Sequence, residues 1–172
     1  MLKELKLGRV VVFVDSANIF YSEKALGWKI SYEKLKKYFD GECISSKVFF
    51  YAAIDEANID QQRFIGKVRS AGLTVITKPV KRIRGSSGSV RLKGNVDVEL
   101  SMDILDKRDE YDTAVLMSGD SDFAPVVDKI KSLGKRIIIM STNDRVSKEL
   151  LDRGKYINIK KLRDVIELTD NP

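Results

Sequence analysis

The sequence of 172 residues contains no histidine and one cysteine, Cys43. The absence of histidine excludes Ser-His-Asp catalysis, Cys-His catalysis and histidine-based acid–base chemistry. A lone cysteine can form neither an internal disulfide nor a thiolate zinc site. Any hydrolytic chemistry must therefore use carboxylates, lysines, hydroxyls or a bound hard cation.

Long apolar runs are also absent. No run approaches the roughly 18 residues that a membrane span needs, and the charged segment Met1–Gly8 is too short for a signal peptide. We therefore expect a cytoplasmic protein with no membrane partner.

Acidic residues are missing from one segment, Lys78–Lys93, which holds six basic residues. The rest of the chain carries 25 basic and 25 acidic residues, so this segment accounts for the whole net charge of +6. Such a local excess indicates either contact with a polyanion or a solvated linker. The Gly/Ser-rich stretch Gly85–Ser89 inside it predicts a loop.

Short apolar runs alternate with helical patterns along the chain. The runs are rich in β-branched residues and predict buried strands at Arg9–Val14, Lys47–Ala53, Leu73–Thr77, Thr113–Met117 and Arg136–Met140. Helices are expected at Ser31–Phe39, Asp60–Ser70, Asn95–Asp109 and Asp122–Leu133, and a short strand and a helix after Lys155. This alternation predicts one α/β domain over residues 1–172, with a parallel sheet covered by helices on both faces.

Acidic residues stand where two of these strands end. Asp15 directly follows the first strand, and Asp120 and Asp122 follow the fourth. Asp97 lies in the first turn of the helix after the third strand, near the same edge of the sheet. Since ligands of open α/β sheets bind outside the carboxyl ends of the strands, these carboxylates are expected to share one small space.

Each of these acids has a simpler interpretation as a helix cap or as a charge favoured by a helix dipole. A cap needs only one side-chain oxygen, however, and here Asp120 and Asp122 bracket Ser121. Clustered carboxylates repel one another unless a cation or a shared proton offsets the repulsion. An all-oxygen ligand set suits Mg²⁺ or Mn²⁺, which supports the hypothesis of metal-dependent phosphodiester cleavage.

Three ordered motifs resemble those of NYN domains, the PIN-like nucleases that include the LabA-like proteins. The motifs are Asp15-Ser16-Ala17-Asn18, which resembles "DxxN", Lys93-Gly94-Asn95-Val96-Asp97, which resembles "KGxVD", and Ser118-Gly119-Asp120-Ser121-Asp122-Phe123 with Pro125, which matches "SGDSDF-P". The resemblance covers residues from about Arg9 to Leu162. It implies a three-layer, PIN-like and Rossmann-like sandwich with a five-stranded parallel sheet of order 3-2-1-4-5 and an extra short C-terminal strand.

The resemblance also implies roles for individual residues. Asp15, Asp97 and Asp120 would hold the metal ion, and Asp122 would be a further ligand or a hydrogen-bond acceptor behind the ligands. Asn18 and Ser118 would support the site by orienting water or ligands. Lys93 would contact a phosphate, and the charge of its segment extends the expected nucleic-acid contacts to Lys81, Arg82, Arg84 and Arg91.

Two other acids and one substitution bear on the size of the site. Asp103 lies about 240° around an ideal helix from Asp97, which places it outside the site and on the exposed face. NYN relatives often carry an Asp near the last strand, where this chain has Asn158. Asp144, after the fifth strand, is the candidate to replace it, so the number of metal ions stays open between one and two.

Two functions compete at this point. The first is a Mg²⁺- or Mn²⁺-dependent ribonuclease, and the second is an RNA-binding or regulatory module with little catalytic activity. Other carboxylate enzymes fit less well: a haloacid-dehalogenase-type phosphatase needs an Asp where Ala17 stands, and a Toprim domain needs a Glu in place of Asp15. No Walker A motif is present. A homodimer is a further expectation, because many metal nucleases pair their basic surfaces.

Overall fold

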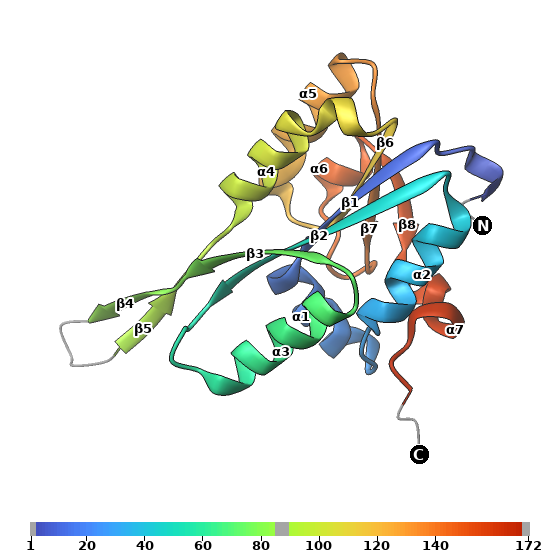
Figure 1. The fold of residues 1–172 in the computed structure, drawn as a ribbon. Coiled ribbons are helices and arrows are strands. Elements are labelled where there is room, and N and C mark those ends of the chain that lie inside the picture. Colours follow the sequence, from blue (N-terminus) through green and yellow to red (C-terminus); the bar gives the residue numbers. More distant parts are fainter. Residues whose placement is uncertain (1–2, 85–89, 170–172) are drawn as a thin grey trace.

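The computed structural model describes residues 3–84 and 90–169. Its centre is a parallel sheet of six strands in the order β3-β2-β1-β6-β7-β8 (Figure 1). The strands are β1 (Arg9–Asp15), β2 (Ser45–Ile54), β3 (Thr74–Pro79), β6 (Thr113–Met117), β7 (Arg136–Ser141) and β8 (Lys155–Asn158). This topology confirms the predicted order 3-2-1-4-5, and β8 is the predicted extra strand.

Both faces of the sheet are covered, which explains why its strands are continuously apolar. In β1, Val10, Val12 and Val14 pack into one core, whereas Val11 and Phe13 pack into the other. Side chains that alternate between two cores must all be apolar, so the strand shows none of the polar alternation of a half-exposed strand.

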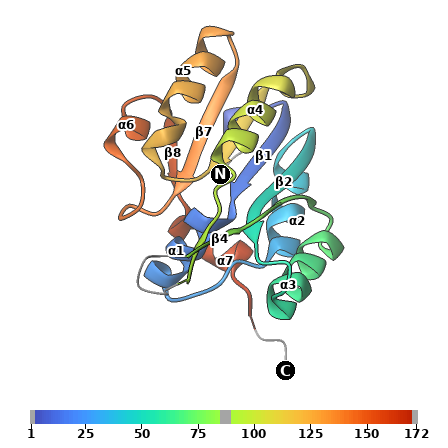
Figure 2. The same cartoon turned by 90° about the vertical axis from the view of Figure 1, so that its left-hand side faces the viewer.

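The helices form the two outer layers (Figures 1 and 2). On one face lie α1 (Ser16–Leu26), α2 (Tyr32–Glu42), α3 (Ile59–Ser70) and α7 (Arg163–Ile166). On the other lie α4 (Asp97–Asp106), α5 (Ala124–Ser132) and α6 (Lys148–Leu151). The short 3-10 helices are η1 (Lys3–Leu5), η2 (Arg108–Glu110), η3 (Ser121–Phe123) and η4 (Ile159–Leu162). The three-layer α/β fold predicted from the sequence is confirmed.

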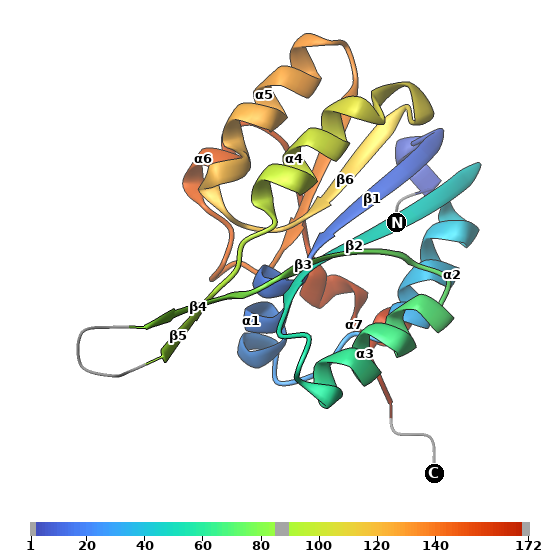
Figure 3. The same cartoon turned by 60° about the vertical axis from the view of Figure 1, so that its left-hand side comes forward.

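The basic segment contains two strands that the sequence analysis did not predict. It forms an antiparallel ribbon of β4 (Lys81–Arg84) and β5 (Val90–Lys93), which projects away from the body of the protein (Figure 3). The stretch 85–89, where a loop was predicted, lies outside the described residues. The ribbon is a direct continuation of β3, and its second strand leads back to the start of α4.

A switch in chain direction places the candidate site. After β1 the chain builds β2 and β3 on one side, and then returns to place β6 on the other side of β1. The carboxyl ends of β1 and β6 are therefore neighbours, with the connections leaving them on opposite sides, which is where open α/β sheets bind ligands. Within the described part of the chain, no helix is long and apolar enough to cross a membrane.

Candidate functional site

Three carboxylates converge near the carboxyl end of β6. Asp97 begins α4, Asp120 precedes η3, and Asp122 lies within η3. One carboxylate oxygen from each side chain lies within 4.8 Å of the others. Among the described residues, no lysine or arginine forms an ion pair with any of the three. Carboxylates at this spacing form a donor set that suits a divalent cation.

Local capping geometry brings these acids together. Asp120 is the N-cap of η3, and its Oδ1 accepts a hydrogen bond of 3.0 Å from the backbone N–H of Asp122. Asn95 Oδ1 accepts one of 2.6 Å from the backbone N–H of Asp97, which fixes the start of α4. Capping occupies only one oxygen of Asp120, so the cap and the cluster are compatible.

Asp15 lies beside this cluster but is not one of its three members. It is buried, with 4% of its surface exposed, and it is the N-cap of α1. Its Oδ1 accepts hydrogen bonds from the backbone N–H groups of Ala17 and Asn18 at 3.1 and 3.2 Å. Its Oδ2 accepts one of 2.9 Å from the hydroxyl of Ser118. Asp15 thus ties the start of α1 to the end of β6.

Ser118 and Asn18 extend this connection to the segment that carries Asp120. The buried Ser118 Oγ accepts a hydrogen bond of 3.3 Å from the backbone N–H of Asp120. Asn18 Oδ1 accepts one of 3.0 Å from the backbone N–H of Gly119. These contacts hold the segment after β6 against α1 and so fix the position of Asp120.

Burial and mutual repulsion make two of the acids reluctant to ionise. The pKa of Asp97 is raised mainly by burial and further by the charges of Asp120, Asp122 and Glu99, although a hydrogen bond with Asn95 opposes the shift. The pKa of Asp15 is likewise raised by burial, and the charge of Asp97 adds to the effect. Asp15 and Asp97 therefore interact electrostatically, and a bound cation would favour the ionised form of both.

The family follows from comparison with known proteins. The model of the NYN domain family matches residues 9–160. The chain belongs to the NYN domain family. NYN domains are in general PIN-like nucleases that bind nucleic acid and usually use divalent metals, so membership indicates an RNA-related function.

Two individual proteins resemble this NYN domain. The "Low amplitude and bright protein LabA" of Synechococcus elongatus is 29% identical over 169 residues, which span 95% of this chain and 90% of LabA. The crystal structure of a protein of unknown function from Vibrio parahaemolyticus matches with a TM-score of 0.78 at 22% identity, covering 95% of this chain and 98% of that one. The second likeness concerns the fold alone.

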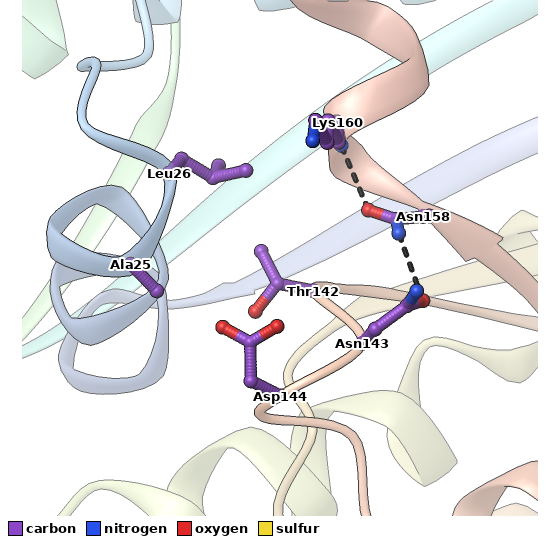
Figure 4. A pocket seen from close by; sticks show the side chains of 7 residues that line it. All are labelled: Ala25, Leu26, Thr142, Asn143, Asp144, Asn158 and Lys160. Carbon is purple, nitrogen blue, oxygen red and sulfur yellow. Dashed lines mark hydrogen bonds between the residues drawn. The ribbon is translucent and has the colours of Figure 1, made fainter.

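The acid proposed to complete the site lies elsewhere in this NYN domain. Asp144 lines a pocket of about 170 Å³ between the end of α1 and the ends of β7 and β8 (Figure 4). It points toward Thr142 there, and Asn158 Nδ2 donates a hydrogen bond of 2.8 Å to Asn143 Oδ1. The structure does not bring Asp144 into the group formed by Asp97 and its two partners.

Asp103 is outside the cluster, as its helical position predicts, but it is not on the exposed face. Its Oδ2 accepts a hydrogen bond of 2.6 Å from the hydroxyl of Tyr51, and its Oδ1 pairs with Lys107 at 2.9 Å. The large aromatic side chain of β2 reaches α4 here, and this contact half-buries the carboxylate. The expectation that Asp103 lies on the exposed face of the helix was wrong for this reason.

The ribbon of β4 and β5 leads along the chain into α4, the helix that begins at Asp97. Lys81 is exposed, whereas the side chains of Arg82, Arg84, Arg91 and Lys93 lie outside the described residues. Gly94 joins the ribbon to α4, and a Cβ atom there would come within 2.6 Å of Ala53 Cβ and 2.8 Å of Val80 Cγ1. Close packing at this glycine fixes the base of the ribbon on the sheet, directly before Asp97.

The raised pKa of Asp97 predicts a pH-dependent stability difference. In the window between the ordinary carboxyl pKa and the raised pKa of Asp97, this side chain binds more protons in the folded metal-free protein than in the unfolded chain, so its contribution to stability falls as the pH rises. Asp97→Asn removes this contribution. We therefore expect the stability of the variant, relative to that of wild type, to increase with pH across the window. Urea unfolding with a chelator present, at a series of pH values, measures this difference.

Asp60→Asn is the control for this measurement, because the Asp60 side chain is 92% exposed and lies on α3. Its stability is measured over the same pH series, so that the effect of the same chemical change inside the cluster can be separated from its effect outside it. A constant difference between Asp97→Asn and wild type at every pH would contradict the electrostatic coupling described above.

Proposed function

We propose that this NYN domain is a metal-dependent ribonuclease that hydrolyses RNA phosphodiester bonds. The observation that carries the proposal is the convergence of Asp97, Asp120 and Asp122 at the carboxyl edge of the sheet, without a paired lysine or arginine among the described residues. Carboxylates this close together repel one another unless a cation or a shared proton offsets the repulsion. This cluster offers oxygen atoms at a spacing that one hard cation can bridge.

The donor chemistry favours Mg²⁺ or Mn²⁺. No histidine exists in the chain, and the single cysteine, Cys43, lies after α2. A bound ion of this kind lowers the pKa of a coordinated water and stabilises negative charge on phosphoryl oxygens. Asp97, Asp120 and Asp122 would hold the ion, and Asp15 belongs to the same electrostatic unit because its pKa responds to the charge of Asp97.

Asp15, Asn18 and Ser118 have a positioning role in this proposal. Their hydrogen bonds fix the backbone of Gly119 and Asp120 relative to α1. A carboxylate ligand is useful only if its oxygen is held where the ion needs it, so this buried network prepares the site before the ion binds. It also explains why Asp15 is kept buried despite the cost of its charge.

The basic ribbon supplies the surface for the RNA backbone. In the proposal, Lys81, Arg82, Arg84, Arg91 and Lys93 contact phosphates, and the ribbon leads the strand to the cluster at the start of α4. Contacts of this kind do not depend on base identity and weaken as salt rises. The basic residues would therefore determine the affinity for RNA, whereas the acidic residues would carry out the cleavage.

Metal dependence is the test of this proposal. A labelled RNA incubated with the purified protein is expected to be cleaved in Mn²⁺ or Mg²⁺ and to stay intact in excess chelator, and cleavage should return when Mn²⁺ is restored. Gel analysis of the products measures this. Cleavage that persists undiminished in chelator would reject the metal-dependent mechanism, and RNA that is bound but never cut with either ion would favour a binding or regulatory module.

A further inference from the structure

An exposed aromatic pair on α1 is not explained by packing. Phe20 and Tyr21 are 52% and 50% exposed, and their rings meet edge to face with centroids 5.6 Å apart. The buried residues of α1 are Ile19 and Ser22, so the helix is anchored by other side chains. Two large adjacent aromatic rings that remain half in solvent suggest contact with a ligand.

Cationic groups lie over both rings. Lys24 Nζ is 4.3 Å from the ring centroid of Phe20 and 5.7 Å from that of Tyr21. The guanidinium carbon of Arg145 lies 5.4 Å from the ring centroid of Tyr21. We call Phe20, Tyr21, Lys24 and Arg145 the aromatic surface. It combines ring faces and edges with positive charge, the two properties with which proteins bind single-stranded nucleic acid.

The aromatic surface is fixed to the segment that carries Asp120. Asn18, which accepts a hydrogen bond from Gly119, precedes Tyr21 by three residues and so lies on the same side of α1, about one turn away. Arg145 also lies close to this loop, because a Cβ atom added at Gly119 would lie 2.1 Å from the carbonyl oxygen of Arg145. The backbone N–H of Ser147 also donates a hydrogen bond of 2.8 Å to the carbonyl of Gly119. Both the helix and the Arg145 segment therefore pack directly on the loop of the acidic cluster.

We propose that the aromatic surface binds an unpaired base of the RNA next to the phosphate that reaches the cluster, an inference that rests on the ribonuclease function proposed above. The base stacks on Tyr21 and Phe20, while Lys24 and Arg145 contact the flanking phosphates. A base inside a duplex is already stacked and paired and cannot enter this contact. The surface thus selects single-stranded segments as the substrate.

Charge favours nucleic acid over a second copy of the chain on this surface. A symmetric contact between two aromatic surfaces would bring Lys24 and Arg145 of one copy against the same residues of the other. Like charges at such a contact are unfavourable, whereas the phosphates of an RNA strand neutralise them. The surface therefore fits a polyanion that also carries planar rings.

A binding experiment that needs no cleavage tests the inference. The protein carrying Asp120→Asn is titrated, in Mg²⁺, into a single-stranded RNA that contains a fluorescent base analogue whose emission falls on stacking. Adding Tyr21→Leu should weaken binding about tenfold and remove most of the emission change. Adding Tyr21→Phe, which keeps the ring, should preserve both. A duplex of the same sequence should bind with an affinity that Tyr21→Leu does not change.

Ile44→Ala is the matched control. Ile44 is 84% exposed and lies directly before β2, at the amino ends of the strands and thus away from the acidic cluster. It should leave binding and emission unchanged. Equal affinity and equal emission change for Tyr21→Leu and its parent would overturn the inference, even if the wild type cuts RNA. A Tyr21-dependent emission change in a protein whose wild type cuts no RNA would uphold the aromatic surface and reject only the ribonuclease function.

Discussion

Asp120→Asn is expected to reduce metal-dependent RNA cleavage by about 100-fold or more while the protein stays folded. Loss of groups that merely support a metal ligand already costs on the order of 10- to 100-fold, and this change removes a charged member of the cluster itself. Asparagine caps helices about as well as aspartate, so the hydrogen bond to the backbone N–H of Asp122 can persist. Initial cleavage rates in Mn²⁺ and thermal unfolding in chelator separate the two effects.

Thermal unfolding should show Asp120→Asn to be at least as stable as wild type without metal, because one of three repelling charges is gone. Asp106→Asn makes the same chemical change at the end of α4, outside the cluster, and should cleave RNA at the wild-type rate. Wild-type cleavage by Asp120→Asn, or an equal loss in Asp106→Asn, would show that the cluster is not the catalytic centre.

The sheet was predictable because its strands are buried on both faces. Continuous β-branched runs such as those of β1 and β7 are typical of central parallel strands, and their observed bounds lie within a residue of the predicted ones. The strand order could not be predicted in this way, because an apolar run does not indicate which strands lie beside it in the sheet. It came from the resemblance to NYN domains, and the pairing of β1 with β6 confirms it.

Helix α1 was missed because it lacks a clean apolar stripe. Its second turn exposes Phe20 and Tyr21, which blurs the period of 3.6 residues. Local signals did bracket it: Asp15 caps its start, and Gly27 ends it with a positive φ of 74°. The two caps, rather than the hydrophobic period, therefore identify this helix in the sequence and, with it, the aromatic surface.

The ribbon was missed for the opposite reason, because charge masked a strand pattern. Ile83, Val90 and Leu92 alternate with basic residues at the spacing of two that a strand requires. The density of basic residues and the intervening glycines and serines favoured a loop instead. The two segments form strands because they pair with each other. Such pairing often outweighs local sequence preference in short strands.

The acids of the site could be predicted in identity more readily than in arrangement. Strand-end position selected Asp15, Asp97, Asp120 and Asp122. Which oxygens converge depends on caps and side-chain hydrogen bonds, and these cannot be read from spacing. The contact between Asp15 and Ser118 is such a case, since it joins residues 103 positions apart in the chain.

Gly119→Ala is expected to destabilise the protein by about 2–3 kcal/mol, because added atoms in a packed region cannot be accommodated without strain. The new Cβ would lie 2.1 Å from the carbonyl oxygen and 2.6 Å from the carbonyl carbon of Arg145, and 2.8 Å from Ser141 Oγ. Two of these atoms are backbone and cannot rotate away. For a chain of this length the corresponding fall in melting temperature is about 4–12 °C, measurable by calorimetry.

The same substitution should also impair cleavage, because Gly119 is the point where three segments meet. Its N–H is held by Asn18, its carbonyl by Ser147, and its neighbour Asp120 belongs to the cluster. Gly41→Ala is the matched control: Gly41 lies in α2 with no atom within 4 Å of a new Cβ, and alanine there should raise helix stability slightly. Equal melting temperatures for Gly119→Ala and wild type would show that the segment of Arg145 does not pack on this glycine. The link between the aromatic surface and the acidic cluster would then lose its structural basis.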